Sequence, residues 1–211
     1  MCKKVYFLLI TEGSSDYALK DHLQNIIVEC GADEAIGVAP DLARLPTPVG
    51  ISVKDKVEAA LRLEPSVNII FIHRDSDAVN PEPRYTEIST QVSSLSTAKP
   101  YVAIVPVQEL EAWLLVDEAS IRSISENPLG TASLNLPKIK NIEKLSNPKE
   151  KLYEALALAS EKSGRHLDKF KQSLPKKRTI LIERMKTTGA IQQLQSWTRM
   201  KNDIQLEISK L

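Results

Sequence analysis

Short apolar runs separated by amphipathic stretches fill the first half of the chain. Such continuous runs are typical of strands buried on both faces of a parallel sheet. We expect strands at residues 5–10, 37–39, 67–72 and 101–105. Apolar residues recur at helical spacing between these runs, which predicts helices at 17–30, 53–63 and 85–96, and a short one at 109–117. Ser14 or Ser15 is expected to cap the first helix, and Gly31 to end it.

The second half contains no convincing strand pattern. Asn147 followed by Pro148 is typical of a helix start, because Asn caps and Pro suits the first turn. Further helical spacing is found around Leu167 and Phe170, over 180–185 and over 191–208.

Strands that alternate with helices predict an α/β fold. We expect a mainly parallel, Rossmann-like sheet sandwiched by helices, with a C-terminal helical extension. The predicted boundaries are an α/β domain at 1–123, a connection at 124–140 and a helical, basic extension at 141–211 that packs on it.

The net charge of +1 hides an uneven distribution. Through Gly130 there are 11 Lys and Arg against 19 Asp and Glu, a net charge of −8; the remainder has 17 against 8, a net charge of +9. The basic half is therefore available for phosphate or an acidic partner. The densest basic run, Lys176, Lys177 and Arg178, predicts a nucleic-acid contact, and a solvated helix end is the alternative interpretation.

Two cysteines cannot form a disulfide framework, and no apolar stretch approaches the roughly 18–20 residues of a membrane span. The apolar run at 5–10 is followed by polar residues where a signal peptide would have a cleavage site. We therefore expect a cytoplasmic protein without membrane association.

Acidic residues follow three of the expected strands. Glu12 follows the first strand, Asp75 and Asp77 the third, and Glu109 and Glu111 the fourth. The carboxyl ends of parallel strands share one edge of a sheet, where ligands bind in open α/β folds. In an extended chain Asp75 and Asp77 would face the same way.

Grouped carboxylates repel one another unless a cation lies between them, and oxygen ligands favour Mg²⁺ or Mn²⁺. Asp16, one helical turn after Glu12, extends the acidic group. The alternative remains open that each is a solvated turn residue or a helix cap.

Three segments resemble the Toprim superfamily. Residues 5–16, VYFLLITEGSSD, resemble the strand and EGxxD signature that opens Toprim domains, and 71–77, FIHRDSD, resemble the strand and DxD signature that follows. Residues 105–117, VPVQELEAWLLVD, resemble a segment of a small stand-alone bacterial Toprim-like family. Residues 147–152, NPKEKL, are similar to another stretch of that family. Its members often accompany ATPases of the overcoming-lysogenization-defect (OLD) type in phage-defence loci.

The resemblance implies metal-dependent phosphodiester chemistry. It implies that Glu12 ligates metal or shuttles a proton, that Asp75 and Asp77 hold the metal, and that Asp16 helps to hold a second ion. Glu111 matches the late acidic position, for which Glu109 is the weaker candidate. Gly13 would let the turn approach a phosphate, and Arg74 would neutralise it or point to solvent.

The expected function is a nuclease that uses one or two Mg²⁺ or Mn²⁺ ions on nucleic acid, with DNA favoured over RNA. An OLD-type ATPase is the expected protein partner, and a homo-oligomeric state stays open. Topoisomerase activity would need a tyrosine-bearing domain for which the chain has no room, and primase activity would need template-binding modules. Haloacid-dehalogenase phosphatases carry DxD after the first strand, and receiver domains carry paired acids there. The alternative is a non-catalytic Toprim-like regulatory or scaffold subunit that binds the ATPase.

Overall fold

The computed structural model describes residues 2–96 and 99–211, and the chain divides into two compact units. Unit 1 contains Met1–Arg74, Pro81–Val105 and Thr198–Leu211; unit 2 contains Asp75–Asn80 and Pro106–Trp197. This grouping differs from the predicted boundaries, because the C-terminal segment joins the sheet unit and residues 106–123 join the helical one.

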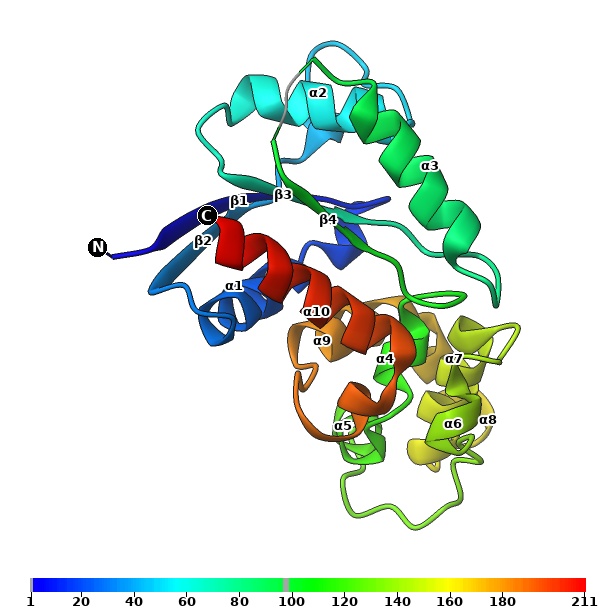
Figure 1. Cartoon of the computed structure of the whole chain (residues 1–211). Coiled ribbons are helices and arrows are strands. Elements are labelled where there is room, and N and C mark those ends of the chain that lie inside the picture. Colours follow the sequence, from blue (N-terminus) through cyan, green and yellow to red (C-terminus); the bar gives the residue numbers. More distant parts are fainter. Residues whose placement is uncertain (1, 97–98) are drawn as a thin grey trace. The chain divides into compact units, whose positions relative to one another are not determined.

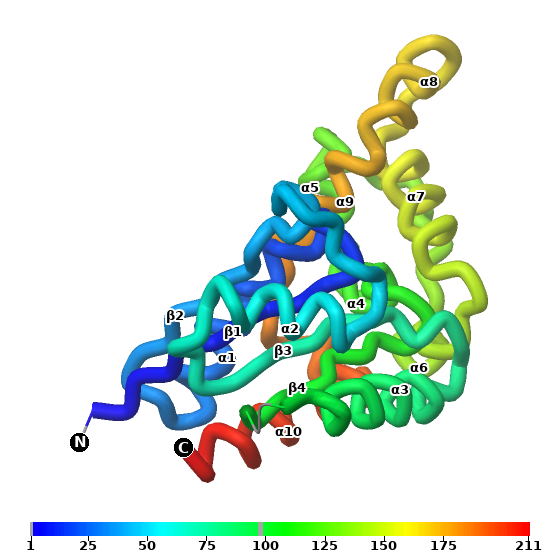
Figure 2. Tube along the Cα trace, turned by 90° about the horizontal axis from the view of Figure 1, so that it is seen from above, coloured from blue at the N-terminus to red at the C-terminus, as the bar shows by residue number. Residues whose placement is uncertain are grey.

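Unit 1 is built on a four-stranded parallel sheet. The strands are β1 (Lys4–Ile10), β2 (Glu34–Val38), β3 (Ile69–His73) and β4 (Tyr101–Ile104). They lie in the order β2-β1-β3-β4, which can be followed from above in Figure 2. In the register, Phe7 of β1 is opposite Gly37 of β2 and Ile69 of β3. The predicted α/β, Rossmann-like class is confirmed, although β2 begins earlier than expected.

Helices cover both faces of this sheet (Figure 1). Alternate residues of a strand point to opposite faces; Leu8, Ile10 and Ile72 point to the face covered by α2 (Val53–Leu63) and α3 (Glu82–Ser93). The opposite face is covered by α1 (Leu19–Glu29) and by α10 (Gln195–Lys210) from Thr198 onward. Lys201 of α10 forms an ion pair with Glu29 of α1 at 2.8 Å.

The β1–α1 connection corrects one prediction. Ser14–Asp16 form the 3₁₀ turn η1, and α1 begins only at Leu19 without a side-chain cap. Neither Ser14 nor Ser15 therefore caps α1. Gly31 ends it as predicted, with a φ of 103°, a conformation that glycine adopts without strain.

Unit 2 is helical. Its elements are α4 (Glu111–Leu114), α5 (Glu118–Ile124), α6 (Ile139–Ile142), α7 (Pro148–Ala159), α8 (Gly164–Gln172), α9 (Leu174–Glu183) and η3 (Gly189–Gln193). The predicted start at Asn147 and Pro148 is confirmed, but the Asn147 side chain bonds Glu150 rather than capping the backbone. In the described part of unit 2 there is no strand, as predicted.

Two tryptophans anchor the interior of unit 2. The rings of Trp113 and Trp197 meet edge to face, with centroids 4.9 Å apart. Trp113 also donates a hydrogen bond from Nε1 to Ser196 Oγ at 2.8 Å, which satisfies its polar atom inside the core. Among the described residues, no helix has the length and apolar character needed to cross a membrane.

Candidate functional site

In unit 1, Glu12 and Arg74 lie at the carboxyl-end edge of the sheet, just after the neighbouring strands β1 and β3. The chain runs outward from β1 to β2 and then crosses to β3 and β4, so the strand order reverses between β1 and β3. Open α/β sheets bind ligands at the carboxyl ends of the strands beside such a reversal. Glu12 follows the end of β1, and Arg74 directly follows β3.

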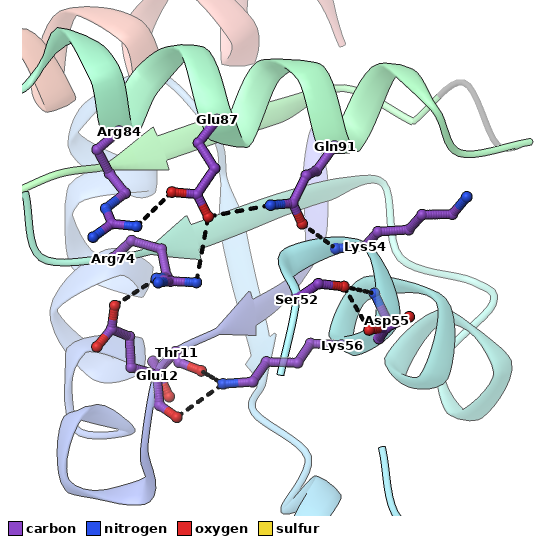
Figure 3. A network of polar contacts seen from close by, with 10 residues as sticks. All are labelled: Thr11, Glu12, Ser52, Lys54, Asp55, Lys56, Arg74, Arg84, Glu87 and Gln91. Atoms are coloured by element: carbon purple, nitrogen blue, oxygen red, sulfur yellow. Dashed lines mark hydrogen bonds and ion pairs between the residues drawn. The ribbon is translucent and has the colours of Figure 1, made fainter. Parts of the chain in front are cut away.

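Arg74 links two carboxylates at this edge (Figure 3). Its Nε donates to Glu12 Oε1 at 2.5 Å, and its Nη1 is 3.7 Å from Glu87 Oε1 on α3. Arg84 and Gln91 hold Glu87 in place, at 2.5 Å and 3.1 Å. The prediction that Arg74 neutralises a phosphate stays untested, but its guanidinium contacts carboxylates rather than extending alone into solvent.

Lys56 adds a second cation next to Glu12. It belongs to α2, and its Nζ donates to the carbonyl oxygens of Thr11 at 3.0 Å and Glu12 at 2.8 Å. Burial lowers the pKa of Lys56, and the positive charge of Arg74 lowers it further. The Glu12 loop is therefore held between two cations that influence each other.

Asp16 occupies a different environment from Glu12. Its side chain is buried, and its Oδ2 lies 3.6 Å from Nδ1 of His73, the last residue of β3. Ser15 donates a hydrogen bond to its other oxygen at 3.2 Å. Asp16 therefore faces the buried imidazole of His73.

Gly13 is not required to be a glycine by the fold. Its φ of −142° is available to any residue, and a Cβ added there would meet no atom within 4 Å. The loop is closed instead by Thr11, whose Oγ1 donates to the Gly13 carbonyl at 2.8 Å. The predicted role of Gly13 in approaching a phosphate fits this open space and remains a prediction.

In unit 2, Asp75, Glu109 and Glu111 form an acidic group. Asp75 Oδ1 accepts a hydrogen bond from the backbone N–H of Leu110 at 2.9 Å, and Glu109 Oε2 accepts one from Lys149 N at 2.9 Å. Burial raises the pKa of Glu109; the Lys149 N–H opposes this, and the negative charges of Glu111 and Asp75 raise the pKa further. Both of these carboxylates therefore act on Glu109.

Asp77 corrects an argument made from the sequence. It is exposed and has a φ of 51°, the left-handed conformation that Asp tolerates better than most residues. Its N–H donates to the Gln108 carbonyl at 2.9 Å. Because the backbone is not extended at Asp77, its spacing from Asp75 does not place both carboxylates on one side.

The basic run in α9 requires a further correction. Arg178 is buried, and its Nε donates to Glu111 Oε1 at 2.6 Å. Lys177 is also buried, and its Nζ donates to the Ile124 carbonyl at 2.9 Å and to Glu126 at 2.8 Å. Only Lys176 of the three is exposed. The run therefore stabilises unit 2 internally and does not form a continuous surface for phosphate.

The predicted metal residues are distributed over both units. Glu12 and Asp16 belong to unit 1, whereas Asp75, Asp77, Glu109 and Glu111 belong to unit 2. Within residues 2–96 and 99–211, no three or more His, Cys, Asp or Glu side chains are grouped as a metal site would require. The predicted convergence of the three strand ends stays a prediction.

Sequence reasoning missed Lys56, Arg84 and Glu87 in the network around Arg74. Nothing in their helical spacing distinguishes them from solvated residues, and only the packing of α2 and α3 on the sheet directs them to this edge. No family model, no curated protein and no solved structure matches the chain.

Proposed function

We propose that this chain is a divalent-metal-dependent nuclease that hydrolyses phosphodiester bonds in nucleic acid, with DNA favoured over RNA. We propose further that it is the Toprim effector of an ATPase-linked phage-defence system, as the resemblance of its motifs implies. The observation that carries the proposal is the position of Glu12, which follows β1 where the strand order reverses, between Lys56 and Arg74.

The side chains at this edge suit a phosphodiester. A phosphate that approaches Arg74 would compete with Glu12 for the same guanidinium, since both are anions that pair well with arginine. Lys56 would add a second positive charge beside the loop. The carboxylate of Glu12, once released from Arg74, could accept a proton or bind a cation.

The donor set is chemically suited to Mg²⁺ or Mn²⁺, because it consists of carboxylate oxygens. The resemblance assigns metal binding to Glu12 and Asp16 in unit 1 and, as a separate group, to Asp75, Asp77, Glu109 and Glu111 in unit 2. When bound, such an ion lowers the pKa of water and offsets phosphate charge.

A nicking assay tests the proposal. Purified protein with Mn²⁺ or Mg²⁺ should convert supercoiled plasmid to the open circular form, and EDTA should prevent the conversion. Changing both Asp75 and Asp77 to Ala should abolish nicking, whereas Lys54→Ala, outside the acidic groups, should leave it unchanged. Undiminished nicking by the Asp75/Asp77 variant would refute the proposed residues.

The second candidate is a non-catalytic Toprim-like subunit that binds a partner ATPase. It is favoured by the ion pairs of Glu12 with Arg74 and Glu111 with Arg178, which occupy two of the predicted carboxylates. If the wild type remains inactive when an OLD-type ATPase is added but still binds that ATPase, this candidate replaces the nuclease.

A further inference from the structure

A cavity of about 410 Å³ lies in unit 1 beside the Glu12 loop. Its walls come from the loops that follow β1 and β2 and from the first turn of α2. One part of the wall is apolar and includes Tyr17, Leu45, Val49 and Ile51. The volume falls in the range of small-ligand sites, about 300–1,000 Å³.

The cavity has one cationic side chain at its wall. Lys56 lines the cavity and uses two N–H donors on the Thr11 and Glu12 carbonyls, as Figure 3 shows. A lysine ammonium has three donors, so the third is available to a ligand. These two bonds fix a flexible side chain in place before any ligand arrives, which reduces the entropy that binding would cost.

The remaining polar groups are also suited to a ligand. Asp41, which follows β2, lines the cavity, and its side chain caps the 3₁₀ turn η2 (Leu42–Arg44) by accepting from Ala43 N at 3.2 Å. A carboxylate after the second strand of a parallel sheet is placed to accept hydrogen bonds from sugar hydroxyls. Gly13 also lines the cavity, and the open space above it leaves the backbone accessible.

We infer that this cavity binds a single nucleotide, with its phosphate on Lys56, its sugar hydroxyls near Asp41 and its base against the apolar wall. A cation, a carboxylate and an apolar wall in one cavity favour a nucleotide over simpler ligands. An inorganic anion would leave the apolar wall unused. A purely apolar ligand would not use the third donor of Lys56 or the Asp41 carboxylate, whose oxygens accept from Ala43 N and pair with Arg44 at 2.9 Å. The loop after β1 has a single glycine, Gly13, so it lacks the repeated glycines of dinucleotide sites.

The inference rests on the proposed function, since it names the nucleotide unit that the nuclease would hold beside the scissile bond. It is tested without metal, so that binding is measured apart from catalysis. Isothermal titration calorimetry in EDTA would compare AMP, adenosine and inorganic phosphate as ligands of the whole chain. AMP should bind most tightly, because it alone uses both the cation and the apolar wall.

One variant tests the phosphate contact of the cavity, and another tests its apolar wall. Lys56→Ala should weaken AMP binding about tenfold or more, the loss expected for one charge-assisted hydrogen bond. Lys54→Ala is the matched control, because it removes the same charge from the same helix and its side chain points away from the network in Figure 3. Ile51→Ser, a neutral change at a position that is 89% exposed, should weaken AMP and adenosine and leave inorganic phosphate unchanged.

A competition experiment distinguishes a nucleotide that belongs to a strand from a free nucleotide. If the cavity holds a nucleotide of a strand, a single-stranded oligonucleotide should displace AMP, and displacement should be lost in Lys56→Ala. If it holds a free nucleotide, AMP should remain bound in the presence of the oligonucleotide.

The absence of AMP binding, or equal binding by wild type and Lys56→Ala, would overturn the inference even if the protein nicks plasmid. AMP binding that depends on Lys56, in a protein that does not nick plasmid even when an OLD-type ATPase is added, would support the cavity assignment and refute the nuclease.

Discussion

Two carboxylate–arginine pairs, one in each unit, differ in their exposure to solvent. In unit 1 the side chains of Glu12 and Arg74 are 40% and 20% exposed, and in unit 2 those of Glu111 and Arg178 are 2% and 10% exposed. Water and ions can compete for the first pair, whereas breaking the second leaves a charge without solvation. The comparison indicates that Glu12 can exchange its partner more readily than Glu111.

The largest expected effect is in unit 2. Arg178→Ala should lower the free energy of unfolding by about 3–5 kcal/mol, because it leaves the Glu111 carboxylate buried without its ion-pair partner. Urea unfolding followed by circular dichroism would measure the change. Lys176→Ala, an exposed change in the same helix, is the control and should stay within about 0.5 kcal/mol of wild type. Equal stability of the two variants would contradict the assignment of Glu111 to a structural ion pair.

The corresponding change in unit 1 should have a smaller effect. Arg74→Ala should lower the unfolding free energy by about 1 kcal/mol or less, since partly exposed ion pairs are screened by water. The same urea experiment measures it. A loss as large as that of Arg178→Ala would show that the Glu12–Arg74 pair is as fixed as the buried one.

Glu126 provides a third, exposed carboxylate for the comparison. Hydrogen bonds from Lys162 and then Lys177 lower its pKa to about 2 from 4.5. Because the folded pKa is depressed, this contribution to stability is complete above the unfolded pKa and is lost as the pH falls from about 4.5 to 2. Its side chain is 63% exposed, so the loss should be below about 1 kcal/mol. Glu126→Gln should reduce the acid sensitivity in this interval, and identical pH profiles would contradict the assignment.

The smallest effect is expected in the Glu12 loop itself. Gly13→Ala should leave the unfolding temperature within about 2 °C of wild type, because the backbone is extended and the added methyl group meets open space. Gly37→Ala in β2 is the contrasting variant, since its Cβ would come within 2.2 Å of the Phe7 ring. Destabilisation by Gly13→Ala as large as that by Gly37→Ala would show that the fold requires this glycine.

The sequence predicted the sheet more accurately than the candidate site. Continuous apolar runs such as 5–10 and 67–72 report burial directly, so the four strands were found. The capping prediction for Ser14 and Ser15 was wrong because a 3₁₀ turn intervenes before α1. The two-residue spacing of Asp75 and Asp77 also could not show that Asp77 takes a left-handed conformation.

The site residues that were misjudged depend on long-range packing. Arg178 looks like part of a solvated basic run, and only the three-dimensional contact with Glu111, 67 positions earlier, shows that it is buried. Lys56 carries no motif, and its role follows from the packing of α2 against the sheet. The sequence pattern therefore predicted which strands are followed by acidic residues, but not which cationic side chains those carboxylates contact.

The central claim is that the acidic groups hold a divalent ion, and Mn²⁺ binding measured by electron paramagnetic resonance tests it without substrate or partner. Wild-type protein should reduce the signal of free Mn²⁺ to an extent that corresponds to one or two ions per chain. The variant with Asp75→Ala and Asp77→Ala should leave more Mn²⁺ free. A wild type that leaves the free Mn²⁺ signal unchanged, or a variant that binds as well as wild type, would contradict the claim.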